Sequence, residues 1–250
     1  MGISLEKIER EAPQLLSLTK KAVNSLSRFG LDGHSAKVAL LLDHSGSMRN
    51  EYSNGSMQRL AEKALALGTQ FDDDGNIDLF FFDSSAIHAG EITINDYQNS
   101  VDALRAGRRM GTTDYADAIN SVREHYGLTG GGIKKGLFGK KSAPGTTALP
   151  VKEPIFVIFL TDGAPDSESA AVRAITEAAD QPIFWKFISI GKSPIPFLQK
   201  LDDLPKRLID NADYQPVGDV DRISDEDLFD VLFEEYPQWL TAARGAGLIQ

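Results

Sequence analysis

The sequence predicts an α/β protein with a doubly wound, mostly parallel sheet flanked by helices. Short, uninterrupted apolar runs recur along the chain, which is typical of strands covered on both faces. Stretches with apolar residues at helical spacing separate these runs, and Gly, Asp and Pro mark many of the boundaries. Strands that alternate with helices form parallel βαβ units, so helices are expected on both faces of the sheet.

The N-terminal half supplies the first expected strands. The helical pattern that opens the chain breaks at Pro13, because proline suits the first turn of a helix and not its interior. The apolar run that follows favours a strand buried on both faces. The expected elements are, in order, a helix over 4–29, a strand over 37–42, a helix over 57–71, strands over 77–82 and 91–94, and a short helix over 97–104.

The C-terminal half contains a change of composition. Residues 127–150 are rich in Gly, Lys, Ser, Thr and Pro, which bury little apolar surface, so a flexible loop is expected. Ser224, with Asp227 three residues later, marks the start of the final helix, and a bend is expected at Pro237. The other expected elements are a helix over 115–126, a strand over 154–160, a helix over 172–179, a strand over 182–191 and a short strand over 214–217.

Length and composition exclude several classes of protein. The chain has 250 residues, enough for one substantial core, and its net charge of −10 argues against nucleic-acid binding, which needs clustered Lys and Arg. It has no Cys, which excludes disulfides, thiolate metal sites and thiol catalysis. The N-terminus carries acidic residues where a signal peptide is apolar, and no segment approaches the roughly 20 apolar residues of a membrane span, so a cytoplasmic protein is expected.

Oxygen-bearing side chains follow two of the expected strands. Asp43, Ser45 and Ser47 leave the first strand on one turn, Asp162 follows the "PIFVIFL" run, and Thr113 lies at the start of a helix between them. In doubly wound sheets, ligands bind beyond the carboxyl ends of the strands. A donor set made of oxygen alone is the kind that hard divalent cations select, Mg²⁺ above all. Because only two of the five groups are carboxylates, an incoming carboxylate could complete the shell of such an ion.

Three motifs, in the expected order, resemble those of a known family. "DHSGS" resembles the Asp-x-Ser-x-Ser of the metal-ion-dependent adhesion site (MIDAS) in von Willebrand factor A (VWA) domains, while "GTTDYADAI" and "FLTDG" are similar to its Thr-bearing and Asp-bearing loops. The resemblance implies a Rossmann-like VWA fold in which Ser45, Ser47 and Thr113 bind Mg²⁺, or Mn²⁺ in its place. Asp43 and Asp162 then lie near the ion or reach it through water.

Longer segments narrow this resemblance. "FDDDGNIDLFFF", "PIFWKFISIG" and "YPQWL" are similar to segments of bacterial VWA domains associated with tellurium resistance, the TerF-like group. The resemblance implies a VWA domain over 37–217 with helical extensions over 1–36 and 218–250. It also implies a binding module of a chemical-stress system, in which a partner protein supplies an Asp or Glu carboxylate to the metal.

The same residues allow other interpretations. Asp43, Ser45 and Ser47 alone could form a polar turn that caps the next helix. A Ser45 nucleophile lacks support, because Asp43 stands where a nucleophile elbow has Gly. The alternative function is a Mg²⁺-dependent phosphoryl-transfer or hydrolytic enzyme at the same site. We expect no enzyme, because no residue of the set pairs a general base with an activated nucleophile.

Several other features have simpler explanations. "DDDGN" and "GLFGKKS" depart from the spacing of calcium and phosphate loops, so a solvated turn and a solvated loop are expected. Asp114 and Asp166 lie next to proposed ligands and either orient them or cap helices. Trp185 and Trp239 are expected in the core. The histidines have no zinc spacing and are expected to be surface or packing residues, with no role as ligands; they are His34, His44, His88 and His125.

Overall fold

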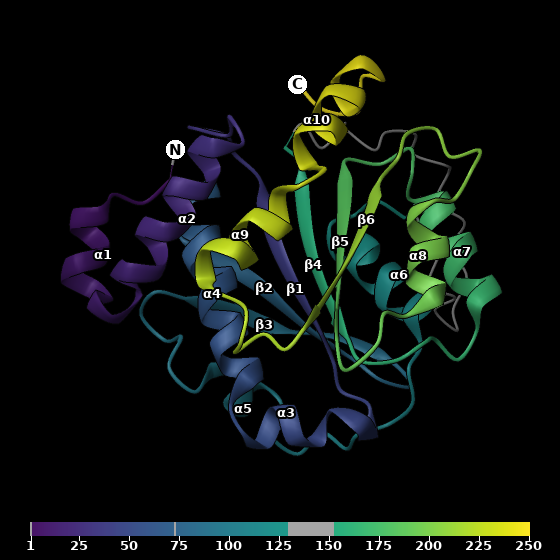
Figure 1. The fold of residues 1–250 in the computed structure, drawn as a ribbon, viewed down its shortest axis with the longest axis horizontal. Helices are drawn as coiled ribbons and strands as arrows, with labels where there is room; N and C mark the ends of the chain where they lie inside the picture. The colour runs from purple at the N-terminus through teal and green to yellow at the C-terminus, as the bar shows by residue number, and fades with distance from the viewer. Residues whose placement is uncertain (1, 73, 130–152) are drawn as a thin grey trace, which may run out of the picture.

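A six-stranded sheet forms the centre of the molecule, shown in Figure 1 by a computed structural model that describes residues 2–72, 74–129 and 153–250. The strand order is β3-β2-β1-β4-β5-β6, and β3 alone in this sheet runs antiparallel to its neighbour. The predicted doubly wound, mostly parallel sheet is therefore confirmed. The strands are β1 (Lys37–Asp43), β2 (Asn76–Phe82), β3 (Ala86–Thr93), β4 (Ile155–Thr161), β5 (Ile183–Ile190) and β6 (Ala212–Gly218).

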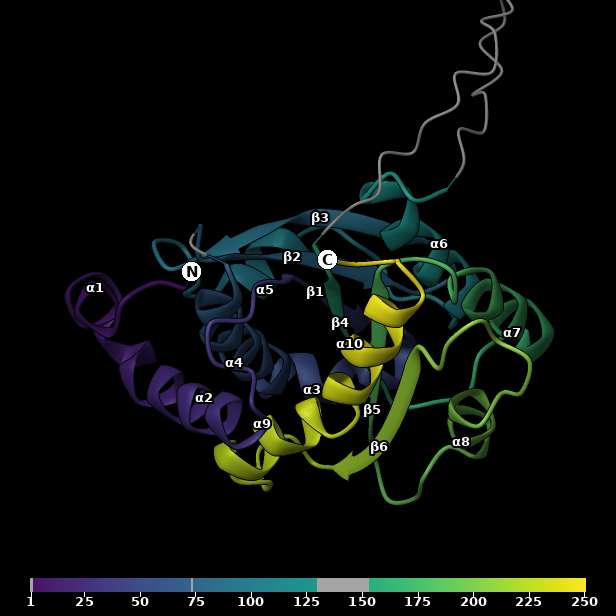
Figure 2. The ribbon, with the colours of Figure 1, turned by 90° about the horizontal axis from the view of Figure 1, so that it is seen from above.

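Helices cover both faces of this sheet. They are α1 (Leu5–Glu11), α2 (Leu16–Arg28), α3 (Arg49–Ser53), α4 (Ser56–Phe71), α5 (Ser100–Leu104), α6 (Tyr115–His125), α7 (Glu168–Glu177), α8 (Pro196–Asp202), α9 (Asp225–Phe233) and α10 (Tyr236–Gly245). Figure 2 shows α2, α4, α9 and α10 on one face and α6, α7 and α8 on the other. No helix in the described part of the chain has both the length and the apolar character that a membrane crossing requires.

The central strands explain the uninterrupted apolar runs of the sequence. Every residue of β4 and β5 is buried, and β1 is buried from Val38 onward. A strand between two helical layers faces apolar side chains on both sides, so alternation with polar residues is lost. Trp185 lies in this core, as expected, and Trp239 is a buried residue of α10.

The C-terminal helices share one core with the sheet. An aromatic cluster joins Phe71 of α4, Phe156 of β4, Phe233 of α9 and Tyr236 of α10, with ring centroids 4.7 to 6.1 Å apart. Aromatic pairs in this range add packing energy beyond the area that they bury. The helical extension over 218–250 therefore packs against the sheet, while the domain boundaries at 37 and 217 stay a prediction.

Some elements differ from the sequence-based expectations. β3 begins at Ala86 and not near residue 91. Its first residues are exposed or half-buried at the edge of the sheet, so "AIHAG" contains no apolar run that would predict a strand. The helix α8 was not expected. The final helix is two helices, α9 and α10, and Ser224 caps the first by accepting a hydrogen bond from the Asp227 N–H at 3.1 Å, as predicted. Most of the predicted loop over 127–150, including "GLFGKKS", lies outside the described residues.

His34 gives the stability of the protein a pH dependence. Its Nε2 lies 2.9 Å from the Tyr236 hydroxyl, and its ring packs edge-on against Phe71. Burial, with a smaller effect of the Arg244 charge, lowers the pKa of His34 from 6.5 to about 4. A depressed pKa means that the fold favours the neutral ring. Its contribution is therefore complete above about pH 6.5 and is lost as the pH falls toward about 4.

We therefore expect the free energy of unfolding to fall more steeply with acidification in the wild type than in His34→Gln. The ring is partly exposed, so the difference should be roughly 1 kcal/mol between about pH 7.5 and about pH 5. Urea unfolding of both proteins, followed by tryptophan fluorescence, measures it. Equal pH slopes for the two proteins would contradict the assignment.

Candidate metal site

The sheet brings the two strongest motifs to one edge. β1 pairs in parallel with β4, so Leu42 lies opposite Leu160. Asp43 ends β1, and Asp162 comes directly after the last residue of β4. Parallel strands end at the same edge, and the side chains that follow them therefore meet.

The serine hydroxyls and Asp162 form one connected group. Ser45 Oγ lies 3.1 Å from Ser47 Oγ, and the Ser47 hydroxyl donates to Asp162 Oδ1 at 2.8 Å. Adjacent ligands of an octahedral ion with bonds of about 2.1 Å stand roughly 3.0 Å apart. The Ser47 oxygen thus stands from the Ser45 and Asp162 oxygens at the spacing of neighbouring ligands around one Mg²⁺-sized ion, and Ser47 is exposed to solvent.

The Asp43 carboxylate links the serine loop to the end of β4. Its Oδ1 accepts a hydrogen bond from the Ser45 N–H at 2.7 Å, and its Oδ2 accepts one from the Thr161 hydroxyl at 2.7 Å. The side chain is fully buried, and burial raises its pKa to about 6. The hydrogen bonds from Ser45 and Thr161 lower the pKa, and the nearby Asp162 charge raises it further. A buried carboxylate beside a second one is an environment that a nearby cation stabilises.

The threonine loop lies against the serine loop. A parallel bridge joins Ser45 to Gly111, and the Gly46 N–H donates to the Gly111 carbonyl at 3.2 Å. A side chain at Gly111 would meet Ser84 Oγ at 2.5 Å, so glycine is needed where the threonine loop passes the turn between β2 and β3. The backbone of Thr113 is thereby held beside the serines.

Asp166 fixes the threonine loop to the loop that carries Asp162. Its carboxylate accepts hydrogen bonds from the Thr112 hydroxyl at 2.5 Å and the Thr113 N–H at 3.1 Å, and its own N–H donates to the Thr113 carbonyl at 2.9 Å. The Thr112 hydroxyl therefore already has a hydrogen-bond partner in Asp166. Within the described chain, no hydrogen bond joins the Thr113 hydroxyl to the other four predicted ligands. Asp166 orients the loop, while Asp114 caps α6 by accepting from the Asp117 N–H.

The donor set fits a hard divalent cation. The five predicted residues offer only carboxylate and hydroxyl oxygens, and Ser47 Oγ lies from the Ser45 and Asp162 oxygens at distances that suit adjacent octahedral ligands. The assignment of Asp43, Ser45, Ser47, Thr113 and Asp162 as ligands stays a prediction.

Sequence reasoning missed the residues that support this site. Thr161 binds Asp43 from the end of β4, and Tyr115 of α6 donates a hydrogen bond to the Gly163 carbonyl. The Tyr52 hydroxyl donates to the Asp43 carbonyl at 2.9 Å. These contacts join segments far apart in the chain, so no local sequence pattern predicts them.

An arginine-rich pocket lies beside the site. It has a volume of about 480 Å³ and is lined in part by Arg49, Arg105, Arg108 and Arg109. His44 lies at its base, fully buried against Tyr52, and burial lowers its pKa, so the ring is neutral. This pocket places positive charge next to the metal site of an otherwise acidic protein.

Comparison with known proteins identifies the relatives of this chain. The family vWA-TerF-like, described as the vWA found in the TerF C terminus, matches residues 35–132 and 145–249. The uncharacterized protein YcbR of Bacillus subtilis (strain 168) is 33% identical over 241 residues, which cover 94% of this chain and 90% of that protein.

Two solved structures share the fold. Proximal thread matrix protein 1 from the mussel byssus aligns with a TM-score of 0.54 at 14% identity, over 82% of this chain and 48% of that one. The manganese-loaded Plasmodium vivax TRAP protein aligns with a TM-score of 0.52 at 17% identity, over 82% of this chain and 74% of that one. The chain thus spans about half the length of the mussel protein, and the likeness to both is one of fold.

Proposed function

The chain belongs to the vWA-TerF-like family, and from this premise we propose that it is a protein-binding module whose divalent metal captures a carboxylate of a partner. Mg²⁺ is the proposed ion, with Mn²⁺ as a substitute. The observation that carries the proposal is the connected group of Ser45, Ser47 and Asp162 oxygens at the sheet edge, with Ser47 exposed. When bound, the ion supplies a Lewis-acidic centre with a coordination position for the partner's Asp or Glu.

The charges around the site favour an acidic partner. The protein carries a net charge of −10, which repels acidic molecules at long range. In the neighbouring pocket Arg105 and Arg108 pair with Asp102 and Asp83. Arg49 and Arg109 have no ion pair among the described residues, so they supply positive charge locally. A partner with several carboxylates could therefore place one on the ion and others on the arginines.

Binding fits the site better than catalysis does. The Ser45 hydroxyl faces Ser47 and has no imidazole beside it, and both Asp43 carboxylate oxygens are held by other groups. The neighbouring His44 ring is buried against Tyr52 and Phe81. A serine nucleophile needs an adjacent base, and within the described site the only base bonded to a serine hydroxyl is the Asp162 carboxylate, which is itself one of the proposed metal ligands. We therefore propose a module that is not an enzyme.

The proposed cellular role is a bacterial tellurium-resistance or chemical-stress system, inside the cell. The TerF-like family supports this assignment. The chain has no Cys, so it offers no thiol to bind or reduce tellurite. Any contribution to resistance is then indirect, through the partner that the metal site holds.

Partner capture tests the proposal. The full chain is used to capture proteins from its native cell extract in Mg²⁺ and in chelator, and the captured partner is then purified. We expect Mg²⁺-dependent binding that Ser45→Ala with Ser47→Ala removes and that Asp or Glu to amide changes in the partner also remove. Ser17→Ala is the matched control, because it removes an exposed serine hydroxyl from α2, a helix that contributes no residue to the site or to the arginine pocket.

Two results would overturn this function. One is partner binding that survives both chelator and the double serine variant. The other is hydrolysis of nucleotides or phosphate esters by the purified protein in Mg²⁺, abolished by Asp43→Ala, which would establish the enzyme alternative.

A further inference from the structure

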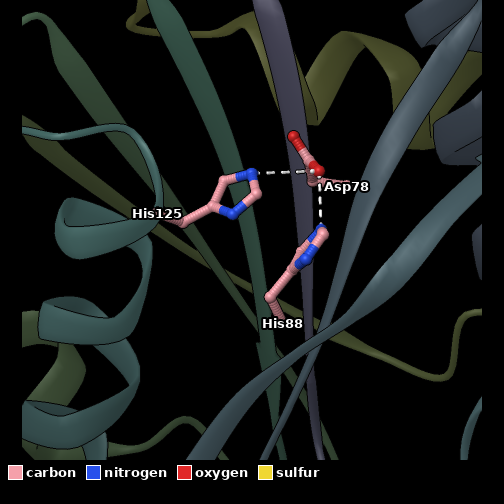
Figure 3. A group of neighbouring side chains, drawn as sticks. All are labelled: Asp78, His88 and His125. Carbon is pink, nitrogen blue, oxygen red and sulfur yellow. Dashed lines mark hydrogen bonds and ion pairs between the residues drawn. The ribbon is translucent and has the colours of Figure 1, made fainter.

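We propose a second metal site, at Asp78, His88 and His125, that binds a late first-row divalent ion, Zn²⁺ foremost. The proposal does not depend on the function of the serine site. His88 Nε2 lies 2.7 Å and His125 Nε2 lies 3.2 Å from the same atom, Asp78 Oδ1 (Figure 3). The three ligand atoms lie within 4.8 Å of one another. For His88 and His125 the proposal departs from the expectation that all four histidines are surface or packing residues, and that expectation stays a prediction.

These distances are close to those that a tetrahedral ion requires. With bonds of about 2.1 Å, neighbouring ligand atoms around Zn²⁺ stand roughly 3.4 Å apart. The observed separations of 2.7 and 3.2 Å need only small side-chain rotations to reach that value. Both imidazole side chains are 30% exposed and Asp78 is 14% exposed, so an ion can enter from solvent.

A β-bulge brings His88 to the correct face of the sheet. β2 and β3 pair Asp78 with Glu91 and Leu79 with Gly90, and the register then shifts so that Phe80 faces His88. In an unbroken ladder Phe80 would face Ala89, and His88 would point to the opposite face. Bulges frequently re-aim a side chain next to a functional site.

The helix α6 supplies the third ligand and a supporting residue. His125 is its last residue and packs edge-on against Phe80, with its ring centroid 4.0 Å from that of His88. The Tyr126 hydroxyl donates to Asp78 Oδ2 at 2.5 Å. This bond occupies Oδ2 and leaves Oδ1 turned toward both imidazoles. Residues behind a metal ligand commonly orient it through such a hydrogen bond.

The chemistry of these ligands differs from that of the serine site. Two imidazoles and one carboxylate suit Zn²⁺ and related ions, whereas hydroxyls and carboxylates suit Mg²⁺. Three protein ligands leave at least one position of the ion open for water or an added ligand. The new site lies at the C-terminal end of α6, while Thr113 precedes the N-terminal end of the same helix. The helix α6 has 11 residues, so its length of about 16 Å separates the two sites.

Zn²⁺ titration followed by NMR of the histidine ring protons tests the proposal. The full chain is kept in excess Mg²⁺, so that the oxygen-only site competes less for Zn²⁺. We expect the His88 and His125 signals to shift together and to saturate at one equivalent, while those of His34 and His44 stay unchanged. Zn²⁺ at the serine site would instead perturb His44, which stands between Asp43 and Ser45, and would leave the His88 and His125 signals unmoved.

Variants assign the response to these residues. His88→Ala and Asp78→Asn should each remove the saturable response, and Tyr126→Phe should weaken binding about 10-fold. His34→Gln is the matched control, since it removes a histidine outside the cluster and should leave the Zn²⁺ response unchanged. Circular dichroism verifies that each variant is folded. Unperturbed His88 and His125 signals, or a response that His88→Ala leaves intact, would show that the cluster is a hydrogen-bonded group without a metal.

Discussion

Asp162→Ala is expected to lower the affinity of the protein for Mn²⁺ by at least about 100-fold and to leave the fold intact. Asp162 is the partly exposed carboxylate of the site, and its only side-chain hydrogen bond among the described residues is with Ser47. A full charge a few ångströms from a divalent ion is a large part of the binding energy even in a polar environment. Because the side chain supports no buried group, the free energy of unfolding should change by less than about 1 kcal/mol.

Isothermal titration and the electron paramagnetic resonance of free Mn²⁺ measure this effect. Asp180→Ala is the control for net charge, because this exposed carboxylate follows α7 at the helix end away from Asp162. Asp166→Ala should give an intermediate loss, since Asp166 orients the threonine loop without contacting Ser47. Unchanged Mn²⁺ affinity in Asp162→Ala would show that this residue does not belong to the metal site.

Asp213→Ala is expected to lower the free energy of unfolding by about 3–5 kcal/mol. Asp213 and Lys186 face each other on β6 and β5, form a direct ion pair, and have side chains 1% and 0% exposed. Burial lowers the pKa of Lys186 and raises that of Asp213, so each group depends on the other for its charge. Removal of the carboxylate leaves a buried ammonium without its partner, which is among the largest single-residue penalties in proteins.

Urea unfolding with far-ultraviolet circular dichroism measures this loss. Glu168→Ala is the matched control: it breaks the Lys200–Glu168 pair, whose side chains are more than half exposed, and should change stability by less than about 1 kcal/mol. The double change Lys186→Met with Asp213→Leu should recover much of the lost stability, because it removes both charges and fills the same space. A loss below about 1 kcal/mol in Asp213→Ala would mean that water reaches Lys186.

Much of the oxygen-rich site can be predicted from the sequence, because its motifs are local. Ser45 and Ser47 stand two residues apart after an apolar strand, and Asp162 follows another strand, so the carboxyl edge of a parallel sheet is expected to gather them. The contacts of Thr161 and Asp166 cannot be predicted in this way. They depend on which loops touch after the strands have paired, and side chains of these types occur on many surface turns.

The histidines illustrate the same limit. His88 and His125 stand 37 positions apart in a chain without zinc-like spacing, and an unbroken β-ladder would have turned His88 away from Asp78. One residue of bulge reverses the face of a side chain, and such irregularities leave little trace in hydropathy. A list of four histidines therefore contains two packed rings and one candidate site without distinguishing them.

The sequence alone determined the class of fold and the chemistry that is open to this protein. Alternating apolar runs and helical patterns require a covered parallel sheet, and a chain without cysteine leaves oxygen and imidazole as its metal ligands. Tertiary structure decided which of those ligands meet. Strand order, register and one bulge place Ser47 against Asp162 and both imidazoles against Asp78, because contacts between distant residues are set by the packing of whole elements and not by neighbours in the chain.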